Sequence, residues 1–288
     1  MQLCKWRDAT GQARVGLVRQ EMVYPLDLAD TPEHPALSTI LHAKNPSQFA
    51  ESLLSSSASP LHIDELSLLP PIDHQEVWAA GVTFQRSEEA RKRESHDAAI
   101  FYDKVYRAPR PELFFKAPAY RVIGPGGRVR IRKDSLWSVP EPELAVICDP
   151  DLRIVGYTIG NDMSARDIEG ENPLYLPQAK IYDGSCALGP VITLAPAMPP
   201  LPQVQVILTI QRQGRTVFHG QTTMAQMRRT IEELISWLGR ETTFPHGVVL
   251  LTGTGIVPPD DFTLEPDDLI HIEITGVGRL ANIVERKS

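Results

Sequence analysis

The sequence has few cysteines, and they are not spaced for a shared task. It contains three, Cys4, Cys148 and Cys186, an odd number with no CxxC pair among them. A disulfide framework needs paired cysteines in an oxidising compartment, and a structural zinc site needs cysteines or histidines at short, regular spacings. The sequence therefore suggests neither kind of site, and the apolar or small neighbours favour three buried thiols.

Long apolar runs and a concentration of positive charge are also missing. No run approaches the roughly 20 apolar residues that cross a bilayer, and the start, MQLCKWRDATGQARVG, has no apolar stretch of signal-peptide length. The 29 basic residues are scattered among 36 acidic ones, and the net charge of −7 indicates no footprint for a phosphate backbone. We expect a cytoplasmic protein that binds neither nucleic acid nor a membrane.

With 288 residues, 42% of them hydrophobic, the chain is long enough to bury a substantial core. Its first part is predicted to contain strands at 2–7 and 13–19 and helices near 37–41 and 46–54. A Ser- and Pro-rich stretch that ends at Ile72 follows and is typical of a linker. We therefore predict a small N-terminal α/β domain over residues 1–70 and a larger domain over residues 71–288.

The larger part is rich in short β-branched segments bounded by turns, which is the pattern of strands. Strands are predicted at 113–116, 128–131, 143–147, 154–159, 191–194, 204–211, 216–219, 248–251 and 269–274, and one helix at 224–238. The alternating strand and helix pattern of a parallel sheet is missing. We expect an α+β, mostly β fold, in which a mostly antiparallel, folded-over sheet carries a few covering helices.

Residues 86–106 differ from the rest, because charges and apolar residues alternate there at helical spacing. Core packing explains so many charges poorly. We predict a helical lid that is less ordered without substrate than the sheet beneath it.

The most informative stretch is VPEPELAVICDPDLRIVGYTIGNDMSARD, residues 139–167. Glu141 and Glu143 are two residues apart, so in an extended segment both side chains leave the same face of the backbone. Asp162 follows the next predicted strand and adds a third carboxylate if the two strands are neighbours. Three such oxygen ligands suit Mg²⁺. We expect a cation here because the sequence offers no nearby cluster of bases, although spacing alone leaves a solvated strand end open.

Ordered segments of the chain resemble the catalytic domain of the fumarylacetoacetate hydrolase superfamily. They are Gly81, PELFFK (111–116), EPELAVI (141–147), GNDMSARD (160–167), QAKIYDGSCALGP (178–190), LLTGTGIVPP (250–259) and GVGRLANIVE (276–285). The resemblance implies a mixed β-sandwich roll and a homodimer or dimer of dimers. It also implies Mg²⁺ on Glu141, Glu143 and Asp162, a site that Mn²⁺ or Ca²⁺ would also enter.

The resemblance assigns roles to further residues. Lys180 in QAKIYDG matches the family's active-site lysine, which lies beside the metal and contacts the substrate, whereas an isolated lysine is usually a surface residue. Thr254 in TGTG would grip a carboxylate or belong to an ordinary tight turn. Arg166 would bind a substrate carboxylate or pair with Asp167. Both alternatives stay open for each of these two residues.

The start of the lid separates activities within the superfamily. Hydrolytic and decarboxylating members begin it with G-x-N-Y-x-x-H-x-x-E, whose His and Glu orient a water. In the corresponding residues 81–90, Ser87 and Ala90 stand in those two positions. The sequence is similar instead to the branch that dehydrates 2-keto-3-deoxypentonates, in GVTF-x-RS, RPELFFK, VPEPEL and the run from GNDMSARD to ALGP.

The resemblance thus implies a lyase of pentose degradation that converts a small 2-keto acid, 2-keto-3-deoxy-D-pentonate, into 2,5-dioxopentanoate. Lys180 would transfer the C3 proton, Glu112 would be a second acid/base group or else a loop carboxylate, and Arg86 and Ser87 would face the hydroxylated tail. The rival is a hydrolase or isomerase of a 2-keto diacid or acylpyruvate from aromatic degradation. A non-catalytic binding protein on this scaffold would have lost the carboxylates or the lysine, and all are present.

Overall fold

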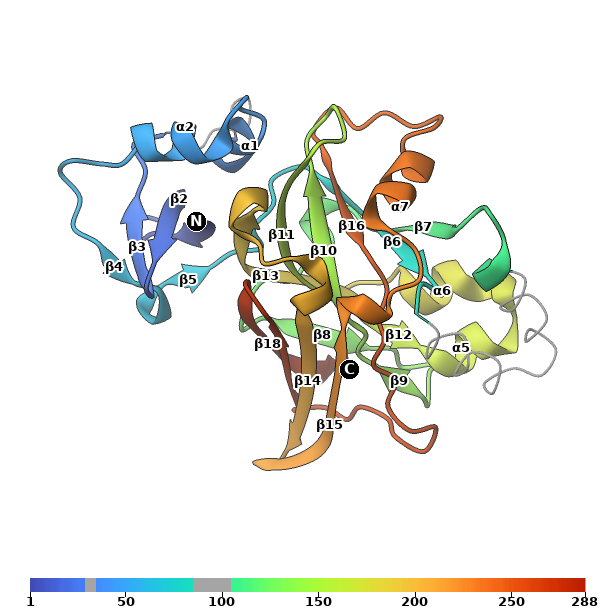
Figure 1. The fold of residues 1–288 in the computed structure, drawn as a ribbon. Coiled ribbons are helices and arrows are strands. Elements are labelled where there is room, and N and C mark those ends of the chain that lie inside the picture. Colours follow the sequence, from blue (N-terminus) through green and yellow to red (C-terminus); the bar gives the residue numbers. More distant parts are fainter. Residues whose placement is uncertain (29–34, 85–104, 288) are drawn as a thin grey trace.

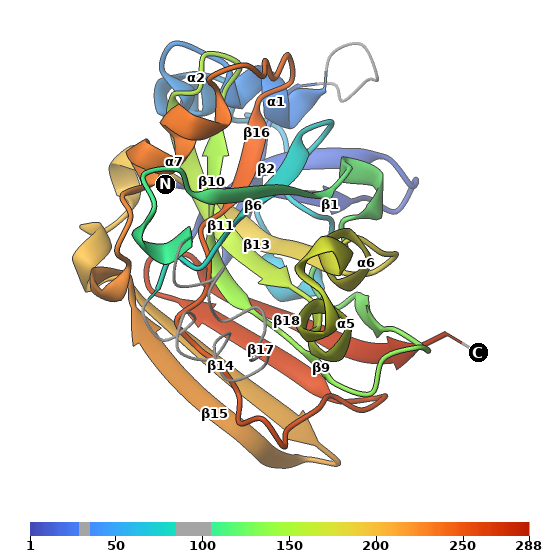
Figure 2. The ribbon, with the colours of Figure 1, turned by 90° about the vertical axis from the view of Figure 1, so that its right-hand side faces the viewer.

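The computed structural model describes residues 1–28, 35–84 and 105–287, and two β-sheets dominate them (Figures 1 and 2). The larger sheet has the strand order β4-β3-β2-β1-β13-β11-β10-β16-β6-β7, and β5 also pairs with β1. Its strands are β1 (Gln2–Arg7), β2 (Ala13–Arg19), β3 (Met22–Pro25), β4 (Leu61–His62), β5 (Ser67–Leu68), β6 (Glu76–Gly81), β7 (Glu112–Ala117), β10 (Pro142–Cys148), β11 (Ile154–Asp162), β13 (Cys186–Leu194) and β16 (Val248–Leu251).

The smaller sheet has the order β15-β14-β17-β18-β8, and Figure 2 shows most of it below the larger one. Its strands are β8 (Arg128–Ile131), β14 (Gln205–Arg212), β15 (Arg215–Thr223), β17 (Leu269–Ile274) and β18 (Gly278–Arg286), and a separate pair joins β9 (Ser138–Val139) to β12 (Ser164–Ala165). The helices are α1 (Ala36–Leu41), α2 (Pro46–Ser52), α5 (Arg166–Glu171), α6 (Leu176–Lys180) and α7 (Ile231–Leu238). Short 3₁₀ helices are η1 (Ile63–Glu65), η2 (Ala119–Arg121), η3 (Pro173–Tyr175), η4 (Ala195–Ala197), η5 (Leu201–Gln203) and η6 (Met224–Gln226).

Strand β10 is buried on both faces because it lies between two hydrophobic clusters. Leu144 and Val146 belong to the cluster that the two sheets enclose. Ala145 and Ile147, which alternate with them, belong to the cluster that contains α1 residues such as Ile40. Successive side chains of a strand point to opposite faces, so Glu143 shares its face with Ala145 and Ile147. The two-layer, mostly β architecture predicted from the sequence is confirmed.

The N-terminal strands continue the larger sheet. Strand β1 pairs antiparallel with β13, with Gln2 opposite Thr193 and Leu3 opposite Ile192. The segment after the predicted linker is tied down by Asp73, which accepts hydrogen bonds from the backbone N–H and the hydroxyl of Ser38 at 2.7 Å each. The predicted strands 2–7 and 13–19 are confirmed, and the domain boundary near residue 70 stays a prediction.

Most sheet pairings are antiparallel, as expected, and the parallel ones join β16 to β6 and β18 to β8. All strands predicted in the larger part are found, some of them longer than expected. The strands missed are β3, β4, β5, β6, β9, β12 and β18, several of which have only two residues. The three cysteines are buried, and burial raises the pKa of each thiol to about 12. No described helix is long and apolar enough to cross a membrane.

The predicted helix 224–238 was wrong in its first half. The α-helix begins only at Ile231, after Met224–Gln226 has formed a 3₁₀ turn. The hydroxyl of Thr230 accepts a hydrogen bond from the backbone N–H of Glu233 at 3.1 Å and caps the helix. A threonine followed three residues later by glutamate is a known helix start, which apolar spacing alone overrode. The predicted lid lies largely outside the described residues, since 85–104 are not among them.

Candidate active site

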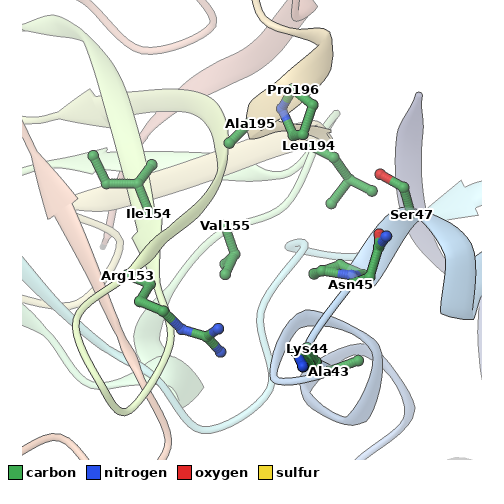
Figure 3. A pocket seen from close by; sticks show the side chains of 11 residues that line it. Ala43, Lys44, Asn45, Ser47, Arg153, Ile154, Val155, Leu194, Ala195 and Pro196 are labelled. Atoms are coloured by element: carbon green, nitrogen blue, oxygen red, sulfur yellow. The ribbon is translucent and has the colours of Figure 1, made fainter.

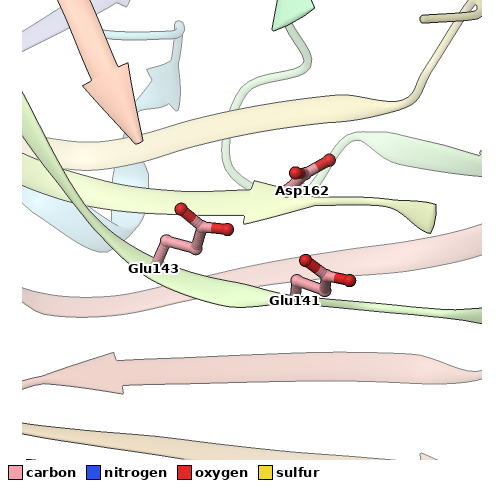
Figure 4. Close-up of side chains that lie close together, drawn as sticks. All are labelled: Glu141, Glu143 and Asp162. Carbon is pink, nitrogen blue, oxygen red and sulfur yellow. The ribbon is translucent and has the colours of Figure 1, made fainter. Parts of the chain in front are cut away.

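Three carboxylates meet where β10 and β11 run side by side. Glu141 precedes β10, Glu143 lies in it and Asp162 ends β11. The backbones of Glu141 and Asp162 exchange two hydrogen bonds of 2.9 and 3.2 Å, which places both residues at the same level of the antiparallel pair. Oxygens of the three side chains lie within 4.8 Å of one another, and Figure 4 shows them turned toward a common space. Each residue is at most 4% exposed.

Lys180, the last residue of α6, reaches this cluster. Its Nζ donates to Glu141 Oε2 at 2.9 Å, to Asp162 Oδ2 at 3.1 Å and to the hydroxyl of Ser164 at 2.6 Å. The Ser164 hydroxyl donates in turn to the carbonyl of Asp162 at 3.1 Å, so it acts as an acceptor toward the lysine. Lys180 is 2% exposed and is therefore no surface lysine.

Arg166 begins α5 and is also buried. Its Nη2 pairs with Glu141 Oε1 at 2.5 Å and its Nη1 with Glu169 Oε2 at 3.2 Å. Asp167 accepts hydrogen bonds from the Ser135 hydroxyl at 2.7 Å and from the backbone N–H of Leu136 at 2.6 Å. Of the two roles left open for Arg166, pairing with Asp167 is thus less favoured, and the guanidinium lies on a carboxylate of the cluster.

Sequence reasoning missed Lys116. This residue of β7 is fully buried; its ammonium pairs with Asp162 Oδ1 and donates to the carbonyls of Met163, at 3.0 Å, and of Lys180. A lysine inside the apolar run LFFKA was the available signal, because a buried lysine needs a compensating partner. The expectation that no cluster of bases lies near the carboxylates was therefore wrong, since the fold brings Lys116 and Arg166 there as well as the expected Lys180.

Acidic groups nevertheless outnumber basic groups in the described part of the site. Glu141, Glu143, Asp162 and Glu169 face the cations Lys116, Lys180 and Arg166. Burial, and then the charges of Asp162 and Glu141, hold the pKa of Glu143 well above its usual value, against the opposing effects of Lys180 and a hydrogen bond from the Gly253 N–H. A surplus of buried, clustered carboxylate oxygens fits a hard divalent cation.

The remaining predicted residues lie around the same space. A cavity of about 20 Å³, room for roughly one water, is lined by the three carboxylates, Lys180, Glu112 and Thr254 among others. Glu112 is half-buried at the start of β7. Thr254 is 4% exposed, and its hydroxyl accepts from the Ile256 N–H at 3.1 Å, so it both forms a tight turn and borders the cavity. Arg86 and Ser87 lie outside the described residues.

A larger cavity of about 370 Å³ lies elsewhere, between the connection of α1 to α2 and the ends of β11 and β13 (Figure 3). Its charged lining residues are Lys44 and Arg153, both exposed, and Arg153 pairs with Asp149 at 2.6 Å. Its lining includes no carboxylate or histidine. Cavity size therefore does not identify the candidate active site in this molecule.

Comparisons with known proteins agree with the site. The profile of the family described as fumarylacetoacetate (FAA) hydrolase C-terminal matches residues 77–285. A probable 2-keto-3-deoxyxylonate dehydratase of Haloferax volcanii is 46% identical over 74% of this chain and 73% of its own length. The 2-dehydro-3-deoxy-D-arabinonate dehydratase of Saccharolobus solfataricus is 44% identical over 82% and 79%. A solved 2-keto-3-deoxy-D-arabinonate dehydratase complexed with magnesium and 2,5-dioxopentanoate is 35% identical, covers 100% of this chain and 99% of its own, and superposes with a TM-score of 0.86. The chain belongs to the fumarylacetoacetate hydrolase family.

Proposed function

We propose that this protein is a Mg²⁺-dependent hydro-lyase that converts 2-keto-3-deoxy-D-pentonate into 2,5-dioxopentanoate. The observation that carries the proposal is the buried cluster of Glu141, Glu143 and Asp162 with Lys180 upon it, in a chain 46% and 44% identical to two dehydratases. Those relatives are named for xylonate and arabinonate derivatives. Loss of the C2 and C3 centres leaves only C4, so both D-sugar acids give one substrate.

Glu141, Glu143 and Asp162 would hold the cation, which when bound acts as a Lewis acid on the 2-keto group and so acidifies the C3 hydrogens. We assign the transfer of the C3 proton to Lys180, because its nitrogen lies at the carboxylate cluster and borders the cavity. We assign to Glu112 the role of the second acid/base group, which would protonate the departing C4 hydroxyl, and its position in the lining of the same cavity supports this role. A proton shift from C5 to C3 then gives the C4–C5 enol, which becomes the aldehyde when its hydroxyl proton moves to C4.

Thr254 and Arg166 complete the proposed substrate side of the site, together with Arg86 and Ser87 from outside the described residues. Thr254 borders the cavity, and Arg166 lies on Glu141. The rival hydrolytic function is disfavoured by the sequence, because Ser87 and Ala90 replace the His and Glu that would orient a water. Hydrolysis requires an activated water molecule as its nucleophile, whereas dehydration does not.

Product analysis distinguishes the two functions. Purified protein with Mg²⁺ is incubated with 2-keto-3-deoxy-D-pentonate, and 2,5-dioxopentanoate is followed through an NADP-linked aldehyde dehydrogenase. Acylpyruvates and fumarylacetoacetate are tested in parallel by loss of diketone absorbance, with Glu143→Gln as the control for metal-dependent turnover. We expect semialdehyde and little or no diketone cleavage. Diketone cleavage without semialdehyde would refute the proposal.

Three further parts of the proposal concern the protein in its cell. A homodimer or dimer of dimers is supported by the large apolar side chains of Tyr120, Leu136 and Leu174, which are 82%, 85% and 83% exposed in the single chain. Light scattering on the purified protein tests it, and a monomeric mass would contradict it. A cytoplasmic location and a role in pentose degradation stay predictions, which cell fractionation and growth of a deletion strain on pentoses would test.

A further inference from the structure

The ammonium of Lys116 contacts protein groups that form the site. It forms an ion pair with Asp162 Oδ1 and donates hydrogen bonds to the carbonyls of Met163 and Lys180. Removing an ammonium from water is costly unless every hydrogen is satisfied. Lys116 is 0% exposed and is not among the residues that line the cavity. It therefore acts on the site through other residues and not on a substrate.

The acceptors of Lys116 are not arbitrary. Asp162 is one of the three clustered carboxylates, Met163 follows it directly, and the Lys180 carbonyl belongs to the residue whose side chain enters the cluster. One buried cation thus fixes a carboxylate and the backbone that carries the active-site lysine. Lys116 and Lys180 also divide the carboxylate of Asp162, since Lys116 holds Oδ1 and Lys180 holds Oδ2.

We propose that Lys116 is a positioning residue that allows Asp162 to offer only one oxygen to the metal and that anchors Lys180 for proton transfer. The inference rests on the proposed function. Mg²⁺ requires a compact octahedral shell, whereas Ca²⁺ accepts six to eight oxygens and readily takes both oxygens of one carboxylate. Lys116 pairs with Oδ1 more closely than Lys180 pairs with Oδ2, which is 3.1 Å away, so Oδ2 is the oxygen left for the metal. This arrangement disfavours the two-oxygen mode and so favours Mg²⁺ over Ca²⁺.

The test compares Lys116→Met with Lys116→Arg and with a matched control, Lys5→Met. Lys5 is a partly buried lysine, with 11% of its side chain exposed, and it also pairs with an aspartate, Asp73, but it lies outside the site. Calorimetric titration gives the dissociation constants of Mg²⁺ and Ca²⁺ without substrate, and steady-state kinetics gives kcat and KM with saturating Mg²⁺.

For Lys116→Met we expect the affinity ratio of Ca²⁺ to Mg²⁺ to rise about tenfold or more. We also expect kcat to fall about 100-fold with a smaller change in KM, the scale of a misplaced reacting group. Lys116→Arg should recover much of both properties because it keeps the charge. Lys5→Met should lower stability while the metal ratio and kcat stay normal. An unchanged ratio and kcat in folded Lys116→Met would overturn the proposal.

A wild-type crystal structure with Mg²⁺ decides the matter even if Lys116→Met does not fold. Lys116 should remain within about 3.2 Å of Asp162 Oδ1, with the metal on the other oxygen. A metal bound by both Asp162 oxygens, or a Lys116 that has left Asp162, would refute the role. Failure of the proposed function is a separate result, since wild-type protein would then bind no Mg²⁺ or form no semialdehyde.

Discussion

Two lysine–aspartate centres with a buried carboxylate lie in the described residues, and they differ in what surrounds that carboxylate. Asp73 is held by Lys5 and by two hydrogen bonds from Ser38, all within the protein. Asp162 is shared by Lys116 and Lys180, and its oxygens lie within 4.8 Å of those of two glutamates. The Asp73 centre therefore has a structural role. Among the described residues, the Asp162 centre holds more acidic than basic groups, and three of its acids lie close enough together to hold a metal ion.

Removal of the metal should have the largest effect, and it should act on the Asp162 centre and not on the Asp73 centre. We expect chelation of divalent cations to abolish turnover and Mg²⁺ to restore it. Unfolding should stay cooperative, because the Asp73 centre does not depend on the metal. Mg²⁺ should also raise the thermal midpoint of the wild type by preferential binding to the folded state. Glu143→Gln, which lacks one ligand, serves as the control and should show a smaller rise. Full turnover of a metal-free sample would contradict the assignment.

Replacement of Lys180, the cation proposed to transfer a proton, should have the next largest effect. We expect Lys180→Ala to lower kcat by at least about 100-fold, the usual contribution of a positioned acid/base group, while the circular dichroism spectrum is retained. Glu112→Gln should also be slow if the carboxylate shares the proton transfer. Near-normal kcat in Lys180→Ala would exclude the proposed role, whereas near-normal kcat in Glu112→Gln would exclude only that of Glu112.

The sequence predicted the carboxylates of the Asp162 centre better than its cations. Glu141 and Glu143 could be placed on one face because a strand alternates with period two, and the adjacent strand brought Asp162 to them. Lys116 could not be placed in this way, because it reaches the cluster from β7, a strand that pairs with β6 and not with β10 or β11. Local spacing carries no information about such a contact.

The same limit explains the errors in the fold. The strands were predicted from local alternation, but β1 pairs with β13 across more than 180 residues, and local alternation does not predict such a pairing. The late start of α7 was encoded locally by Thr230 and Glu233, and apolar periodicity alone obscured it. Local patterns thus identify elements, while their assembly depends on long-range pairing.

Asp73→Asn should affect stability and not catalysis. The substitution removes the anionic partner of the partly buried Lys5 ammonium, so we expect a loss of about 2 kcal/mol in the free energy of unfolding, between the values for exposed and buried pairs. The kcat should stay normal because Asp73 lies outside the site. Asp183→Asn is the matched control, since its side chain is 65% exposed and its pair with Arg121 is long at 3.4 Å, and it should change stability by less than about 1 kcal/mol. Equal urea midpoints for the two variants would refute the contrast.

The smallest expected effect is a pH dependence at His42, beside the Asp73 centre. Burial lowers the pKa of His42 below 6.5, against the opposing charges of Asp149 and Asp73 and a hydrogen bond to the backbone of His246, while the charge of His246 lowers it further. The unfolded chain therefore binds a proton more readily than the folded one. Stability is complete above the unfolded pKa and falls as the pH drops through about 6.5 toward the folded pKa. Between pH 7.5 and 5.5, the urea midpoint of the wild type should fall further than that of His42→Gln. Equal falls would show that the partly exposed imidazole is protonated in the folded protein as readily as in the unfolded chain.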